Sequence, residues 1–354
     1  MLLWNSAAAF FGAFESFFRL FVRAKPVEWV AYELDGPLDR GPTEDWRRFV
    51  FALPRRQKVR ALSYLRTELV HLAGVAPLRG IVLRFGDLQA SPAVRDELRE
   101  LLRDFRSAGK RVEVHADGLD LADFWLASVA DRIWLAPRGR FDVAGLGSSS
   151  LAGARLLRKF GVAFDVIRAG AFKSAGELMG ADTVSEAQKE QVDVLLGDLY
   201  DAIVTDLAED RGVDTTVVRT WIDEGPCSAR QALERGVVQG LCYVDELRER
   251  LGSEVPPPET PDAAPAPRRA RLGPFAAVLA THPVPVGWMP LLDRRPSVVS
   301  LDISGTIVQG RSRAAPGEQR VAGSDSLVPA LHRLRRDESV KAVVLHIASP
   351  TGAM

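Results

Sequence analysis

Residues 80–116 have the sequence "GIVLRFGDLQASPAVRDELRELLRDFRSAGKRVEVHA", and this stretch decides the fold. Its ends, "GIVLRF" (80–85) and "RVEVHA" (111–116), are short runs typical of strands in a parallel sheet. Between them Ser91 is placed as an N-cap, Pro92 takes the first helical position and Gly109 ends the helix. A strand, a helix and a second strand at this spacing predict a parallel α/β domain.

The same alternation extends on both sides of this stretch. "WVAYEL" (29–34) is predicted as a strand, and a helical stretch follows around 56–74. "LADFWLASVA" (121–130) is predicted as a short helix and "RIWLA" (132–136) as the next strand.

A long helix is predicted from Ser185 to Gly212, because Ser185 and Gln188 form a capping box. Its buried stripe is expected to consist of Val192, Leu195, Leu199, Ile203 and Leu207.

An internal repeat follows a proline-rich stretch. Residues 253–296, which hold about half of the 22 prolines, are predicted as a linker. After it, "LDISGTI" (301–307) aligns with "YELDGPL" (32–38), and "VKAVVLHI" (340–347) aligns with "LRGIVLRF" (78–85).

The expected domains are therefore a first repeat over 26–252, the linker, and the start of a second repeat over 297–354. The sequence given stops just past a predicted buried strand, so we expect either a fragment of a longer protein or a remainder that is unstable by itself.

Composition excludes several classes of function. A length of 354 residues with 47% hydrophobic content allows a large core and two or three domains. The net charge of +0 argues against a general nucleic-acid binder. Cys227 and Cys242 form no CxxC pair, and the five histidines lack metal-ligand spacing, so no metal and no cofactor are expected.

The first 25 residues, "MLLWNSAAAFFGAFESFFRLFVRAK", are predicted to form an amphipathic helix that associates with the cell membrane. A narrow polar stripe runs along this helix at Asn5, Gly12, Ser16, Arg19 and Arg23. A helix lying in the membrane interface fits this stripe better than a full span. The alternative is a helix that covers a groove on its own protein or on a partner subunit.

One lysine stands in unusual surroundings. In "RAGAFKSAGE" (168–177), Lys173 is flanked by small and apolar residues. Burial lowers the pKa of a lysine, by about 3–5 units when it is complete, and a neutral amine can take a proton from a serine hydroxyl. The alternative is that Lys173 extends to solvent or pairs with Glu177.

Three stretches resemble one family of enzymes. "VIRAGAFKSAGE" (166–177), "FWLASVADRIWLAPRG" (124–139) and "GPCSARQALERGVVQGL" (225–241) are similar, in order and spacing, to the signal peptide peptidase A family, also called protease IV. The resemblance covers roughly residues 26–354 and includes the tandem repeat. It implies a ClpP/crotonase-like fold and a Ser–Lys dyad, with Lys173 as general base.

The resemblance also implies where the nucleophile belongs. In this family an "SPGGS" turn of the second repeat supplies the serine, and the corresponding residues here are "SPTGA" (349–353). Gly352 fits as an oxyanion contributor, whereas Ala353, which has no hydroxyl, stands at the nucleophile position and Thr351 replaces the first glycine. Ser174 is a candidate for orienting the amine of Lys173, its alternative role being a contact at a helix start.

The remaining polar candidates are expected to be structural. Ser91 is expected to cap its helix and Ser349 to occupy a turn. His115 and His346 are expected to be hydrogen-bonded core residues on buried strands.

The expected function is that of a membrane-associated serine endopeptidase that degrades signal-peptide remnants as a homo-oligomer. The alternative, favoured by Ala353 and Thr351, is a non-catalytic pseudo-peptidase or peptide-binding scaffold. An enoyl-CoA hydratase-like enzyme on the related fold is disfavoured, because its chemistry uses no lysine base.

Overall fold

The computed structural model describes residues 27–38, 61–149, 153–166, 170, 172–173, 180–253, 269–282, 296–312 and 321–349. The chain divides into two compact units, Met1–Pro283 and Val284–Met354, and each is described by itself below. The predicted N-terminal helix (1–25) lies outside the described residues. Among the described helices, none is both long enough and apolar enough to cross a bilayer.

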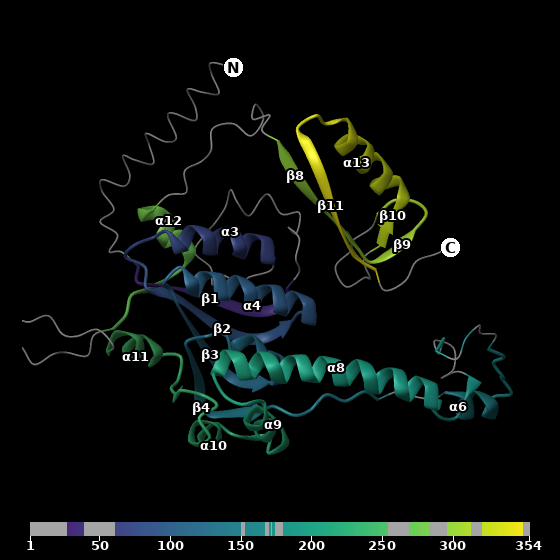
Figure 1. The fold of residues 1–354 in the computed structure, drawn as a ribbon, viewed down its shortest axis with the longest axis horizontal. Helices are drawn as coiled ribbons and strands as arrows, with labels where there is room; N and C mark the ends of the chain where they lie inside the picture. Colours follow the sequence, from purple (N-terminus) through teal and green to yellow (C-terminus); the bar gives the residue numbers. More distant parts are fainter. Residues whose placement is uncertain are drawn as a thin grey trace, which may run out of the picture. The chain divides into compact units, whose positions relative to one another are not determined.

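A parallel sheet forms the centre of the first unit (Figure 1). Its four long strands pair in parallel, and they are β1 (Trp29–Pro37), β2 (Gly80–Gln89), β3 (Arg111–Asp120) and β4 (Arg132–Asp142). Three two-residue strands complete it: β5 (Cys227–Ser228), β6 (Gly240–Leu241) and β7 (Leu272–Gly273). The predicted α/β class with a parallel sheet is confirmed.

Helices follow the strands along the chain. They are α3 (Leu62–Ala73), α4 (Pro92–Ser107), α5 (Leu121–Ala127), α6 (Ala154–Lys159), α8 (Glu186–Arg211), α9 (Thr215–Asp223), α10 (Ala229–Glu234), α11 (Leu247–Ser253) and α12 (Phe275–Thr281). Helix α4 begins as predicted: the Ser91 hydroxyl accepts a hydrogen bond from the Val94 amide at 3.4 Å, and Pro92 follows it.

The two faces of the sheet contribute to two separate cores. Because side chains alternate along a strand, Ile81 and Leu83 of β2 belong to the larger core, which helices α3, α4 and α5 also enter. Val82, on the opposite face, packs in a smaller core with Trp29, Trp134 and the α11 side chains Leu247 and Leu251.

Helix α8 has the predicted ends, but its predicted buried stripe is only half right. The Ser185 hydroxyl accepts from the Gln188 amide at 3.3 Å, and Gly212 ends the helix with φ +64°. Ile203 and Leu207 are buried, whereas Leu195 is 65% exposed. The N-terminal half of α8 extends away from the sheet (Figure 1), so the other described residues of the first unit do not bury it.

The predicted linker (253–296) contains a folded segment. Strand β7 pairs in parallel with the start of β1, and α12 places Phe275 and Val278 in the larger core. Both elements are short, and they lie between proline-rich stretches whose composition gives no sign of them.

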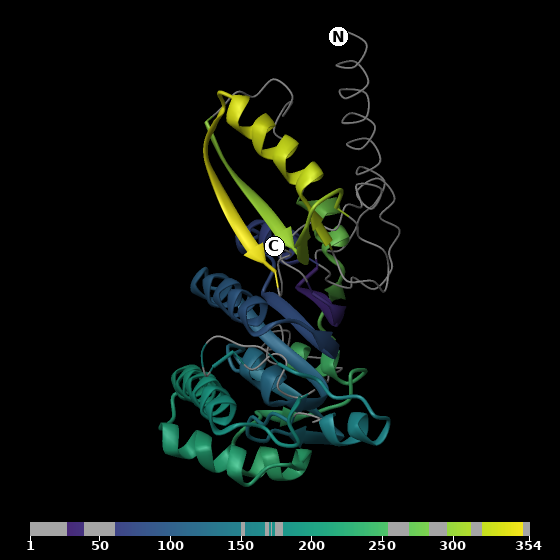
Figure 2. The ribbon, with the colours of Figure 1, turned by 90° about the vertical axis from the view of Figure 1, so that its right-hand side faces the viewer.

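The second unit is a small β–α–β arrangement. Strands β8 (Ser297–Ser304) and β11 (Val340–Ala348) pair in parallel, and α13 (Ser324–Arg336) lies along them (the yellow helix in Figure 2). Short strands β9 (Thr306–Val308) and β10 (Val321–Gly323) pair with each other.

The register of the two units supports the sequence repeat. Tyr32 of β1 is paired with Leu83 of β2, and their aligned counterparts, Leu301 and Leu345, are paired with each other. The same residues of the repeat therefore face each other in both parallel pairs.

The prediction that β11 is a buried strand is wrong for the described residues. Val344 is 55% exposed and Ile347 is 57% exposed, although they point to opposite faces of the strand. The reason is that the sheet of this unit has two strands and a single long helix beside it among the described residues.

Candidate active site

Lys173 lies on a projection of the first unit that we call the arm. The arm comprises the described residues between 153 and 199, from α6 to the N-terminal half of α8. In Figure 1, α6 lies at the far end of α8, away from the sheet. The buried residues of α8 are all in its C-terminal half, at Ile203, Val204, Leu207 and Ala208.

Lys173 itself is exposed to solvent in the structure. Its backbone amide donates to the Gly170 carbonyl at 3.5 Å, and the adjacent Phe172 is 55% exposed. An exposed ammonium keeps its hydration, so the described residues of the first unit do not provide the enclosure that a lysine base requires. Ser174, Gly352 and Ala353 lie outside the described residues.

The arm that carries Lys173 has many uncovered apolar side chains. Seven large apolar side chains of the arm are exposed, and they are Leu156 (61%), Phe160 (77%), Val162 (42%), Phe164 (49%), Phe172 (55%), Val194 (59%) and Leu195 (65%). Where such side chains are contiguous on a surface, they are typical of a site that binds a partner or a ligand. Lys173 and these exposed apolar side chains therefore belong to the same projection of the first unit.

An ionic cluster around the buried Arg99, which we call the clamp, holds the C-terminal half of α8. Its residues are Arg99, Trp125, Ser128, Asp206 and Asp210. Arg99 is 0% exposed; its Nη1 lies 2.9 Å from Asp210, and its Nη2 lies 3.2 Å from Asp206 without an aligned hydrogen bond. Burial lowers the pKa of Arg99, while the two carboxylates raise it.

Helix α5 completes the clamp. The Trp125 indole Nε1–H donates to Asp206 at 2.8 Å, and the Ser128 hydroxyl donates to Asp210 at 2.6 Å. The Arg99 guanidinium also lies over the Trp125 ring, 4.8 Å from its centroid. Both carboxylates of α8 are therefore paired with groups of α4 and α5, whereas Nε and Nη2 of the buried Arg99 make no hydrogen bond among the described residues.

The clamp was not predicted from the sequence, although a signal was present. Arg95, Arg99 and Arg106 share with Leu102 one face of α4 at helical spacing. Arg95 and Arg99 are buried, at 6% and 0% exposure. Arginines at the spacing of a buried stripe predict buried acidic partners, and these turn out to lie on α5 and α8.

The histidines differ in outcome. His115 is 3% exposed with its Nε2 3.1 Å from the Cys242 carbonyl, so its prediction as a hydrogen-bonded core residue is confirmed. Burial lowers the pKa of His115, which favours the neutral ring. The prediction of a buried place for His346 is wrong: it is half-buried, because few elements cover β11.

Neither cysteine is suited to act as a nucleophile. Burial raises the pKa of the Cys242 thiol to about 11, and it also raises the pKa of the half-buried Cys227. The thiolate is the reactive form, so both side chains are in the unreactive state at neutral pH. Within the described residues, no group of three or more His, Cys, Asp or Glu side chains is arranged to hold a metal ion.

Comparisons with known proteins point to one family of peptidases. The sequence profile of Peptidase family S49 matches residues 104–255, a span that includes Lys173 and both clamp carboxylates. Protease 4 of Haemophilus influenzae is 26% identical over 286 residues, covering 78% of this chain and 44% of that protein.

Two further relatives agree. Protease 4 of Salmonella typhi is 25% identical, over 78% of this chain and 43% of that protein. The chloroplastic serine protease SPPA of Arabidopsis thaliana is 22% identical, over 82% of this chain and 42% of that protein. The chain thus spans less than half the length of these curated relatives.

Solved structures show weaker similarity. A mutant of the membrane-bound stomatin-specific protease 1510-N matches with a TM-score of 0.35 and 10% identity, covering 64% of this chain and 86% of that one. An enoyl-CoA hydratase/isomerase family protein from Silicibacter pomeroyi matches with a TM-score of 0.32 and 12% identity, covering 54% and 68%. The fold class therefore rests on the sheet topology itself.

Proposed function

Because this chain belongs to the signal peptide peptidase A family of serine peptidases, we propose that it is part of a serine endopeptidase that degrades signal-peptide remnants at the membrane. Lys173 is the general base of its Ser–Lys dyad. The nucleophilic serine belongs to the turn that follows the first long strand pair of the second repeat, where this chain has Ala353.

The observation that carries this proposal is the position of Lys173. It lies within the span that matches the family and on an arm rich in exposed apolar side chains. When such a surface is covered, the ammonium loses hydration and the neutral amine is favoured. The neutral amine then takes the proton of a serine hydroxyl as the oxygen attacks a peptide carbonyl.

We propose that the cover comes from another subunit of a homo-oligomer. The described part of the first unit leaves Lys173 in solvent, so the base becomes competent only in the assembled state. The amide of Gly352, which follows β11 in the sequence, would then stabilise the oxyanion of the tetrahedral intermediate.

The proposed substrates are short, apolar, extended peptides. They match the arm chemically, since Phe160, Phe164 and Phe172 of the arm are exposed and Phe172 directly precedes Lys173. Such peptides remain in membranes after cleavage of signal peptides, and residues 1–25 would hold the enzyme at that surface.

A second candidate function is a non-catalytic pseudo-peptidase that binds peptides. It is favoured by one observation: Ala353 has no hydroxyl to be acylated, and Thr351 replaces a glycine of the family's turn. This candidate shares the peptide-binding arm with the first but makes no covalent intermediate.

Covalent labelling separates the two candidates. The parent chain, the Ala353→Ser variant and the Thr351→Gly/Ala353→Ser variant are each treated with a fluorophosphonate, and adducts are detected by intact-protein mass spectrometry. We expect no adduct on the parent and one adduct on the variants, because they restore the hydroxyl and the turn. Binding of a fluorescent apolar peptide is measured in parallel by anisotropy.

If neither variant is labelled while all three proteins bind the peptide, the pseudo-peptidase is the better description. If no protein binds the peptide and none is labelled, both candidate functions are contradicted.

A further inference from the structure

We propose that Arg99 is a positioning residue that fixes the direction in which the arm presents Lys173. This inference rests on the proposed function, since it assumes that Lys173 must reach a defined place. Arg99 acts through Asp206 and Asp210 of α8, and it contacts neither the substrate nor the reacting atoms.

The direction of α8 depends on the contacts of its C-terminal half, which we call its root. The helix is a single rod of 26 residues, and only its C-terminal half packs against the core. Glu186, at the other end, lies about 30 Å along the axis from Asp206 at 1.5 Å per residue. A tilt of about 2° at the root therefore moves the far end by about 1 Å, and the segment that carries Lys173 leads into this end along the chain. For a catalytic group, a misplacement of about 1 Å can cost about 10²-fold in rate.

Apolar contacts alone hold a helix less strictly than this. Ile203, Val204, Leu207 and Ala208 are buried at the root, and such contacts are not directional. The clamp adds direction, because the planar guanidinium of Arg99 lies 2.9 Å from Asp210 and 3.2 Å from Asp206, which are about one helical turn apart, and its Nη1 also donates to the Ser128 hydroxyl at 2.9 Å.

The clamp is itself anchored on both sides. Arg99 extends from α4, whose Leu98 is in the larger core at 0% exposure. Trp125 and Ser128 belong to α5 and its C-cap, and Phe124 beside them is also 0% exposed. Movement of α8 at this point therefore requires movement of the core.

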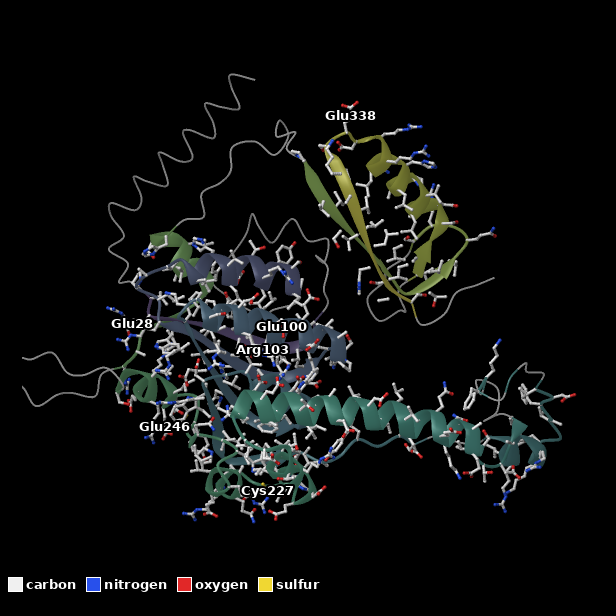
Figure 3. The ribbon with its side chains drawn as sticks, in the orientation of Figure 1. Glu28, Glu100, Arg103, Cys227, Glu246 and Glu338 are labelled. Carbon is white, nitrogen blue, oxygen red and sulfur yellow. The ribbon has the colours of Figure 1, made fainter. Side chains whose placement is uncertain are left out.

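Neighbouring contacts support the clamp but are more exposed. Arg103, which Figure 3 shows on α4 next to α8, lies 3.0 Å from Asp210 with its side chain 32% exposed. Arg219 of α9 pairs with Asp201 of α8 at 2.8 Å, but these side chains are 45% and 67% exposed. Exposed pairs of this kind contribute little, so Arg219 offers a matched control.

Double electron–electron resonance, which measures the distance between two nitroxides, tests the proposal on the full chain. Nitroxides are attached at Leu195→Cys on the arm and Val70→Cys on α3, in a Cys227→Ser background, and the distance distribution is measured. Both chosen sites are exposed, at 65% and 73%. The remaining cysteine, Cys242, is 0% exposed.

Parent, Arg99→Lys and Arg219→Lys proteins are compared. We expect the parent and Arg219→Lys to give the same narrow distribution. Arg99→Lys keeps the charge, but a freely rotating ammonium replaces the planar guanidinium. The distance distribution of this variant should therefore be at least about twice as wide as that of the parent. Circular dichroism and thermal unfolding establish that each variant is folded.

A folded Arg99→Lys protein with the parental width overturns the proposal, and so does a parent distribution that is already broad. If Arg99→Lys does not fold, Asp206→Asn takes its place. Asp206 is 30% exposed, and an amide there retains an acceptor for Trp125 while losing its charge. The same widening is expected, and a parental width again overturns the proposal.

This readout needs no peptidase activity, so the two proposals can fail separately. If no variant is labelled by the fluorophosphonate but the Arg99→Lys distance distribution widens, the clamp orients α8 and has no role in catalysis. If labelling succeeds and the distribution stays narrow, the assignment of Arg99 is wrong. When Arg99→Lys is combined with Ala353→Ser, it should lower the maximal rate of fluorophosphonate labelling without changing the half-saturating probe concentration.

Discussion

At the scale of single residues, burial sets the protonation chemistry of the first unit. Glu113 of β3 is 0% exposed, and its carboxylate accepts from the Trp134 indole at 2.7 Å and pairs with Arg111 at 2.5 Å. Burial raises the pKa of Glu113, while the Trp134 hydrogen bond and the Arg111 charge oppose the rise. The folded state therefore holds this proton more tightly than the unfolded state.

Glu113→Gln should make stability less dependent on pH. A carboxyl whose pKa is raised by folding contributes stability that is fully present below its unfolded pKa and is lost as pH rises through its folded pKa. Glutamine does not titrate, so the free energy of unfolding of the Glu113→Gln protein, relative to that of the parent, should be higher at about pH 8 than at about pH 5. Urea unfolding at both pH values, followed by tryptophan fluorescence, measures this difference.

The matched control is Glu249→Gln, whose carboxylate is 40% exposed and pairs with Arg269 at the surface. It should show no such shift. A Glu113→Gln protein whose stability relative to the parent is the same at both pH values would contradict the role assigned to burial.

At the scale of elements, α8 combines two environments in one helix. Its C-terminal half is part of the core, whereas its N-terminal half belongs to the arm. Leu207 is 0% exposed and Leu195 is 65% exposed, so the same residue type occupies both environments.

Truncation of these two leucines should have unequal effects. Leu207→Ala leaves a cavity and should lower the free energy of unfolding by about 2–5 kcal/mol. Leu195→Ala removes an exposed side chain and should change it by less than about 0.5 kcal/mol. Chemical denaturation of the two variants measures both values. Equal losses of unfolding free energy would show that Leu195 is buried in solution, contrary to the structure.

The elements of the first unit were largely predictable from the sequence. Caps such as Ser91 and Ser185 and the alternation of strands with helices are local signals, and they placed α4, α8 and the parallel strands. The buried stripe of α8 was not predictable, because its apolar spacing continues into a half that the rest of the unit does not cover. Strand β7 and helix α12 are too short to give a periodic signal.

At the scale of the whole molecule, the two units differ in how much apolar surface they bury. In the second unit Ile303 and Ala322 are the buried apolar residues among those described, while Val344, Leu345 and Ile347 of β11 are exposed. The aligned strand β2 of the first unit has Val82 and Leu83 at 0% exposure.

Hydrogen exchange on the full chain should reflect this difference. Amides of β2 and β3 should exchange only through global unfolding of the first unit, whereas those of β8 and β11 should exchange through much easier local opening. Mass spectrometry of proteolytic peptides after labelling compares the repeats directly. Protection of β11 equal to that of β2 would mean that its apolar faces are covered in solution.

The role of the candidate site stays a prediction, and its setting could not be read from the sequence. The resemblance of the motif around Lys173 to the peptidase family selected this lysine as the candidate base. Its exposure agrees with the alternative that the sequence left open, and the sequence could not decide between the two because enclosure depends on what covers the arm. Arg99 was missed because its carboxylate partners lie more than 100 residues away along the chain.

The central claim is that the amine of Lys173 activates a serine at position 353. Its most direct test compares two proteins, the Ala353→Ser variant and the Lys173→Met/Ala353→Ser double variant, in their rates of fluorophosphonate labelling. The control substitution is Lys159→Met, which removes another exposed lysine of the arm. We expect Lys173→Met to abolish labelling and Lys159→Met to leave its rate unchanged, because only the first removes the base. Equal labelling rates with methionine and lysine at position 173 would contradict the account.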